Sequence, residues 1–533
     1  MSLCCSQLSL GRHRRRVPDK QANIKQRSRR GGLDISVLPV TIQDTIHVVR
    51  QLGERYLWID ALCIIQDDDK DKAKQIGKMD LVYGFSVFTI FAAGGTSVRD
   101  PLPGVRPGTR DPKQEIAKIQ GLHLAVPFVL PRSAVETSEW NTRGWTYQEI
   151  NLSRRRIFFT SHFMHFECVT DVYCEDIVAE RINFPWALHP LQCNGWGQFI
   201  SSGVRIRNQS GLRLLNQIDM RLAESGYMTM VEEYTRRKLT QESDIVNAIT
   251  ALINVMAKGF NWAGGEPSEA FRFGMPMGEL ELALVWQPAA NAFHERRMLA
   301  DGNMTPWPSW SWAAWRGAVQ YGSAYAMFAG EGSNSPPGIR ESLVEQWHIV
   351  DDAGKLIRQD VRRTGRTGDG AHWATYVAPN GNIDPRQLVS ENAPLRPGTL
   401  VFRTNSTRFN VAKADNYIGA DAEPNYAMYS ILSDIPRPST RIGRVLLPRS
   451  THLQSSCEFV VLSRTSGHTG WFDEDILDEN RVLHRLGYDG CMFYVMAVQK
   501  IQDEERMQRF GVGVILDRAW LHSVAEQKVV LLG

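Results

Sequence analysis

The chain has 533 residues, of which 43% are hydrophobic and 22% charged, a composition typical of a globular protein with two or three domains. Its formal net charge is only +3, so the composition gives no case for a nucleic-acid-binding protein. The sequence holds no run of about 18 apolar residues, and its basic start lacks the apolar core of a secretion signal. We therefore expect an intracellular, cytoplasmic protein that does not span a membrane.

Residues 1–32 contain nine arginines and lysines against one acid, and they show no apolar period. This pattern predicts a disordered basic tail. The run Arg14–Arg16 suits a nuclear-localisation signal or an anionic-surface patch, and it equally suits a solvated tail with no role. The sequence leaves these alternatives open.

Residues 33–180 have the pattern of a parallel α/β sheet. Apolar residues recur at helical spacing over 42–52, Thr41 and Asp44 have a capping-box-like spacing, and Gly53 fits the position after a helix end. The apolar run 56–65 predicts a buried strand that ends in a cluster of acids. A second helix and a second strand follow, which is the rhythm of parallel α/β folds.

The acids after the first predicted strand have two interpretations. The carboxyl edge of such a sheet is where α/β proteins hold their sites, so Asp60, Gln66 and Asp67 are candidates for binding ribose hydroxyls or a developing positive charge. The alternative is structural, because Asp67–Asp71 precede a helix whose N-terminus favours negative charge. Cys63 lies inside the apolar run, so we interpret it as a core cysteine rather than a nucleophile.

A second polar motif covers residues 140–149, Trp-Asn-Thr-Arg-Gly-Trp-Thr-Tyr-Gln-Glu. We predict a short helix over 145–149 and a strand hairpin formed by 157–160 and 163–168. His162, His165 and Cys168 are spaced three residues apart, which places neighbouring members on opposite faces of a strand. We therefore predict no metal site.

The remaining sequence divides into three parts. Residues 181–320 are expected to be mostly helical, with 239–258 as the clearest helix and a tryptophan-rich turn near 307–315. The tryptophans favour core packing over a stacking platform for a ring-shaped ligand. Residues 321–395 have the composition of a linker or insertion, and 396–533 that of a small mixed β region.

The two motifs together resemble the fungal heterokaryon-incompatibility (HET) domain family. The matching residues include Tyr56-Leu-Trp-Ile-Asp60-Ala-Leu-Cys63-Ile-Ile-Gln66-Asp67-Asp68, the motif 140–149, and Leu152-Ser153-Arg154. The resemblance covers roughly residues 33–320 and implies a TIR-like, flavodoxin-like parallel sheet. It also implies a role in programmed cell death after non-self recognition, with protein partners and self-association through the HET domain.

One departure from the family pattern concerns the first strand. The family opens with a strand like Tyr-x-x-Leu-Ser-Tyr-x-Trp-Gly, and residues 1–32 hold nothing similar. We therefore expect the sheet to lack its first strand, through truncation or a misplaced gene start.

The distant TIR resemblance also implies candidate chemistry. Glu149 is the candidate catalytic carboxylate for cleaving the N-glycosidic bond of NAD, which would be a substrate and not a cofactor. Arg143 and Gln148 would orient that substrate or bind its phosphates. The alternative is that Glu149 forms a structural ion pair with an arginine such as Arg154.

Three functions follow in order of preference. The first is a signalling and interaction module that triggers cell death, the second is an NAD glycohydrolase that uses Glu149, and the third is an inactive, truncated paralogue. A nucleic-acid role through the basic tail is the weakest hypothesis.

Overall fold

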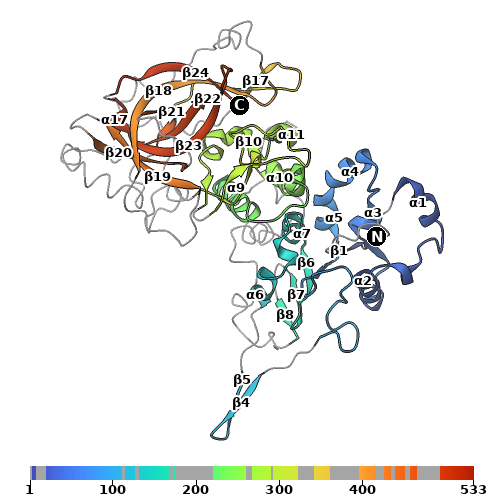
Figure 1. The fold of residues 1–533 in the computed structure, drawn as a ribbon. Helices are drawn as coiled ribbons and strands as arrows, with labels where there is room; N and C mark the ends of the chain where they lie inside the picture. The colour runs from blue at the N-terminus through green and yellow to red at the C-terminus, as the bar shows by residue number, and fades with distance from the viewer. Residues whose placement is uncertain are drawn as a thin grey trace, which may run out of the picture. The chain divides into compact units, whose positions relative to one another are not determined.

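A computed structural model gives the fold as two compact units, Met1–Pro267 and Ser268–Gly533 (Figure 1). It describes residues 3–7, 20–110, 115–125, 131–168, 172–175, 220–259, 267–289, 292–321, 341–359, 395–413, 425–433, 439–449, 456–464, 492–521 and 523–533. Within these ranges, no helix is long and apolar enough to cross a membrane.

The first unit is built on a six-stranded sheet with the order β2-β1-β3-β6-β7-β8. The strands are β2 (Tyr56–Trp58), β1 (Leu3–Gln7), β3 (Thr89–Ala92), β6 (Arg155–Phe159), β7 (Met164–Cys168) and β8 (Val172–Cys174). The first four run parallel, and β7 and β8 add antiparallel pairs at one edge. The predicted parallel α/β sheet and the predicted hairpin over 157–168 are therefore confirmed.

Strand β1 overturns two expectations about the start of the chain. It lies between β2 and β3, with Cys5 opposite both Trp58 and Thr89. Residues 21–27 form helix α1 (Gln21–Arg27). The prediction of a disordered tail is wrong for these two segments, and the sheet does not lack this strand. The sequence of β1 is poor in the β-branched and aromatic residues that mark strands, so only its pairing on both sides reveals it.

We predict that Cys5→Pro destabilises the first unit. Proline removes a backbone donor from a strand that is paired on both edges, a position from which proline is normally excluded. Urea unfolding of the full chain, followed by tryptophan fluorescence, should show a lower midpoint. Cys5→Val keeps the backbone donor and should change the midpoint far less. Equal midpoints for the two variants would contradict the central position of β1.

Helix α2 (Val40–Gln51) follows the predicted pattern, and Gly53 at its end has the expected positive φ of +76°. The predicted capping box is wrong, because both of its residues bind a distant loop. The Thr41 hydroxyl donates to the carbonyl of Asp100 at 2.6 Å, and the Asp44 carboxylate accepts from Arg106 Nε at 2.6 Å. These bonds fix α2 to the loop that follows β3.

The predicted strand over 56–65 is much shorter than expected. β2 ends at Trp58, and three helices follow: α3 (Asp60–Cys63), α4 (Asp69–Ile76) and α5 (Met79–Phe85). Asp60 therefore begins a helix, where its Oδ1 accepts the Ala61 N–H at 2.7 Å. Cys63 is exposed, so its assignment to the core is wrong. An apolar run alone does not separate a strand from a buried helical turn.

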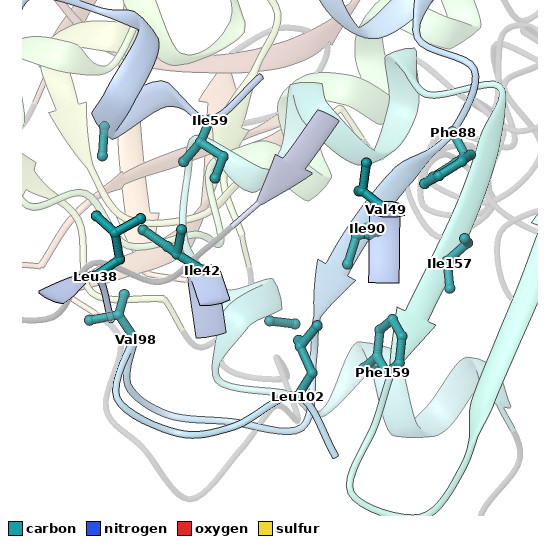
Figure 2. Close-up of a cluster of buried hydrophobic side chains, with 12 residues drawn as sticks. Leu38, Ile42, Val49, Ile59, Phe88, Ile90, Val98, Leu102, Ile157 and Phe159 are labelled. Atoms are coloured by element: carbon teal, nitrogen blue, oxygen red, sulfur yellow. The ribbon is translucent and has the colours of Figure 1, made fainter. Parts of the chain in front are cut away.

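Both faces of the sheet are covered, as parallel strands require. On one face, α2 packs on β3 and β6 (Figure 2). This cluster includes Leu38, Ile42, Val49, Ile59, Phe88, Ile90, Val98, Leu102, Ile157 and Phe159. On the other face, Phe91 and Phe158 stack at 4.9 Å and pack with Trp140 and Ile150. The second motif thus lies against the face opposite α2.

The first unit continues past the strands. A separate hairpin forms from β4 (Ile116–Ile119) and β5 (Leu122–Ala125), and α6 (Pro131–Glu136) and α7 (Thr146–Leu152) precede β6. Helices α9 (Met220–Tyr234) and α10 (Thr250–Gly259) follow. Only the second half of the predicted helix 239–258 is α-helical, since residues 242–249 include two 3₁₀ turns. Of the predicted helical region 181–320, residues 181–219 lie outside the described residues.

The second unit is dominated by a ten-stranded sheet, most of it antiparallel. Its strands are β15 (Glu341–Ser342), β16 (Trp347–Val350), β17 (Leu356–Gln359), β18 (Leu400–Lys413), β19 (Tyr426–Ser433), β20 (Thr440–Pro448), β21 (Ser456–Arg464), β22 (Met492–Lys500), β23 (Met507–Leu516) and β24 (Glu526–Leu532). The four strands predicted in 396–533 are confirmed, in a sheet far larger than the small region expected. Residues 341–359 belong to it, which corrects their assignment to a linker.

Six of these strands close into a ring. β18 pairs β19, β19 pairs β20, β20 pairs β23, β23 pairs β22, β22 pairs β21, and β21 returns to β18. Every pairing in the ring is antiparallel. Because β21 returns to β18, the ring is a closed barrel, and each of its six strands is paired on both sides. The 14 residues of β18 also pair β16 and β24 with their first half.

The tryptophan-rich turn belongs to the core of the second unit. Trp310 and Trp312 are fully buried, and Trp310 Nε1 donates to the carbonyl of Gly398 at 3.1 Å. The packing interpretation is confirmed for these two residues.

Candidate functional site

Helix α7 carries the second motif into the interior of the first unit. Six of its seven residues are buried, among them Tyr147, Gln148 and Glu149. A polar side chain in such a place must find a partner inside the protein or carry a desolvation cost. The partners of these three residues therefore indicate what the motif does.

Gln148 joins three helices. Its Nε2 lies 3.2 Å from Met79 Sδ on α5, and its Oε1 accepts the Ala251 N–H at 3.2 Å. Ala251 is in the first turn of α10, where backbone donors have no partner within the helix. Gln148 thus caps α10 from a neighbouring helix. Both ends of its amide, proposed above as a ligand contact, are engaged in these contacts.

We predict that Gln148→Met lowers the free energy of unfolding by about 1–3 kcal/mol, because it leaves the buried Ala251 N–H without its acceptor. Urea unfolding measures the change. Gln75→Met is the matched control, since Gln75 is only partly buried and bonds Asp71 in its own helix. A loss no larger than that of the control would contradict the capping role.

Glu149 differs from Gln148 because part of its polar end is unpaired. The side chain is 3% exposed, and Oε2 has no hydrogen-bond partner in the structure. Burial raises the pKa of Glu149 well above its ordinary value, and the nearby Asp60 carboxylate raises it further. The positive charges of Arg143 and Arg237 oppose these effects. The site is thus a buried carboxyl with one acid and two arginines as neighbours.

The structure brings together some of the predicted residues and separates others. Asp60 and Arg143 both lie close enough to Glu149 to shift its pKa, Asp60 upward and Arg143 downward. Gln66 is tied to the backbone around Asp60, since its Nε2 donates to the carbonyls of Asp60 and Ile64 at 3.3 and 3.2 Å. Asp67 instead accepts the Gln21 N–H at the start of α1, at 2.9 Å.

The rest of the acidic cluster stabilises helix α4. Asp68 is its N-cap and accepts the N–H groups of Lys70 and Asp71 at 3.0 and 3.1 Å. Asp71 accepts the Ile65 N–H at 2.9 Å. The structural interpretation of this part of the cluster is confirmed.

Arg237 is a member of the site that sequence reasoning missed. Its Nη1 donates to the carbonyl of Asn141 and, at 3.1 Å, to the Thr146 hydroxyl. Its guanidinium lies 4.8 Å from the ring centroid of Tyr147. No local pattern marks this arginine, because its hydrogen-bond partners lie 91 to 96 residues away in the sequence.

A short pairing joins the motif to the same downstream segment. The Gly144 N–H donates to the carbonyl of Lys238 at 2.8 Å, and the Lys238 N–H donates to Thr142 at 2.7 Å. A Cβ atom on Gly144 would lie 2.5 Å from Leu239 Cδ2, so the close approach favours glycine there. The Tyr147 hydroxyl adds a bond to Glu233 Oε2 at 2.8 Å.

Residues 12–149 match the family model for heterokaryon incompatibility protein (HET). The chain carries a HET domain. No curated protein and no solved structure matches the chain. The family match ends at Glu149, whereas the compact unit continues to Pro267 and the contacts of Gln148 and Gly144 reach residues 238–251.

A small cavity lies at the carboxyl end of β3, within the HET domain. It has a volume of about 10 Å³, and its lining includes Thr41, Gly95, Ser97 and Asp100. This is room for about one water molecule and not for a nucleotide. Within the described residues, no group of three or more histidine, cysteine, aspartate or glutamate side chains is arranged to hold a metal ion.

We predict that Glu149→Gln makes the protein relatively more stable as the pH rises. Its raised pKa in the folded state means that the unfolded chain loses this proton first, so wild-type stability falls with pH above the ordinary glutamate value of about 4.3. The loss is up to about 1.4 kcal/mol per pH unit until the folded pKa is reached.

The measurement is urea unfolding of both proteins between pH 4 and pH 9. The difference in unfolding free energy should grow in favour of Glu149→Gln as the pH rises above about 4.3. Glu139→Gln changes an exposed glutamate and should run parallel to wild type. A constant difference between wild type and Glu149→Gln would contradict the raised pKa.

Proposed function

We propose that this protein is a cell-death effector of the heterokaryon-incompatibility type, and that its HET domain acts as a signalling and interaction module. The observation that carries the proposal is the use of the motif side chains. Gln148, Tyr147 and Gly144 connect α7 and the turn before it to α5, α9, α10 and the segment after α9. These contacts support a rigid platform for protein partners, a second copy included, in the cytoplasm.

We propose further that the sheet is TIR-like. The parallel strands follow the order β2-β1-β3-β6, which corresponds to the 2-1-3-4 part of a flavodoxin-like sheet. This order supports the relation, and the antiparallel edge strands β7 and β8 depart from it.

NAD cleavage is the second candidate, favoured by the group around Glu149. In that reaction the bond between ribose C1′ and the nicotinamide nitrogen breaks, its electron pair leaves with nicotinamide, and water adds to C1′ and loses a proton. Because burial favours the protonated form of Glu149, the negative charge that stabilises the ribose cation would come from Asp60. Glu149 would then donate a hydrogen bond, and Arg143 would bind phosphate.

Expression in a fungal host separates the two candidates, with viability and cellular NAD followed together. For the module, we expect wild type and Glu149→Gln to kill equally while NAD stays constant. For NAD cleavage, NAD falls before viability does, and Glu149→Gln and Asp60→Asn lose about 100-fold or more of the rate. Glu139→Gln is the control in both cases. If wild type lowers neither quantity, both candidates fail and the inactive paralogue is favoured.

A further inference from the structure

We propose that Arg237 is the positioning residue of the Glu149 site, and that the segment around it, outside the family match, is a working part of the HET unit. The proposal deepens the second candidate function, because it concerns the same carboxyl group. It rests on the contacts that one guanidinium makes with the turn before α7 and with α7 itself.

The first set of contacts fixes the turn from which Arg143 projects. Arg237 Nη1 donates to the carbonyl of Asn141 and lies 3.3 Å from the carbonyl of Arg143. Arg237 Nη2 donates to Asn141 Oδ1 at 2.9 Å. Two nitrogens of one planar fork thus hold the backbone and the side chain of the same asparagine.

The second set fixes the start of α7. The bond to the Thr146 hydroxyl and the contact with the Tyr147 ring lie on consecutive residues of its first turn. Thr146 also donates to the carbonyl of Arg143 at 2.7 Å. Because Glu149 is one helical turn beyond Thr146, the placement of this turn decides where its carboxyl group lies.

Charge adds a third connection. The charge of Arg237 lowers the pKa of Glu149, and the charge of Glu149 raises the pKa of Arg237. Glu233, Tyr147 and Tyr234 also interact with the guanidinium. Asp60 and Arg143 complete the charged surroundings of Glu149. Arg237 therefore orients the site and offsets part of the effect of Asp60. A lysine would keep the charge but could not reproduce the planar fork.

The chain offers a matched control beside this residue. Arg236 is exposed, whereas Arg237 is partly buried against the motif. Arg236→Met removes the same side chain from the neighbouring position without touching the turn. The test set is thus wild type, Arg237→Met, Arg237→Lys and Arg236→Met, each also made with Glu149→Gln.

The test is an infrared titration of the full chain. Subtracting the spectrum of each Glu149→Gln partner isolates the carboxylic-acid band of Glu149. We expect Arg237→Met to move the loss of this band to higher pH, because the substitution removes a positive charge that favours the Glu149 carboxylate. Arg237→Lys should restore most of the shift, and Arg236→Met should match wild type. An unshifted titration in folded Arg237→Met would overturn the proposal.

A second readout separates positioning from charge, and separates this proposal from the proposed function. Where wild type consumes NAD, Arg237→Lys should titrate like wild type and still lose about tenfold of the rate, since the fork is gone. Full activity in folded Arg237→Lys would overturn the positioning role. If Glu149→Gln kills as wild type does, the NAD candidate fails, and the infrared titration still decides the effect of Arg237 on Glu149. If Arg237→Met does not fold, the rate of NAD consumption by Arg237→Lys provides the test.

Discussion

The first unit depends on the burial of a polar helix. Helix α7 places Gln148 and Glu149 in the interior, where an unsatisfied polar group costs about 1–3 kcal/mol. The structure offsets this cost by surrounding α7 with partners from distant parts of the chain: Met79 before it, and Arg237 and Ala251 after it. The sheet, the motif and helices α9 and α10 therefore belong to one compact unit, although the family match covers only its first part.

The sequence predicts the elements whose signals are local. Helix α2, strand β3 and the hairpin of β6 and β7 each carry a periodic or apolar pattern of their own. Strand β1 carries no such pattern. It is a strand because it pairs with β2 on one edge and β3 on the other, which its own sequence does not indicate. The capping box at Thr41 fails for the same reason, since the side chains of Thr41 and Asp44 bond to a distant loop and not to the helix end.

The residues of the candidate site also differ in whether a local sequence pattern predicts them. Glu149, Asp60 and Arg143 were predictable because a motif names them, and the structure places them near one another. Arg237 was not, because its role exists only once residues 141–147 are folded against it. The closed ring of the second unit was likewise hidden, since the return of β21 to β18 cannot be read from the pattern of either strand.

Polar residues in the motifs serve two purposes, and hydrogen bonding tells them apart. The side chains of Gln148 and Asp68 have their hydrogen-bonding groups paired, with backbone N–H groups and, for Gln148, also with Met79 Sδ, so stability alone accounts for them. Glu149 is buried with an unpaired oxygen beside a second acid, which lowers stability near neutral pH. A glutamine there would avoid the cost of ionisation. A buried glutamate that destabilises the folded protein indicates a function for its carboxyl group, because packing does not account for it.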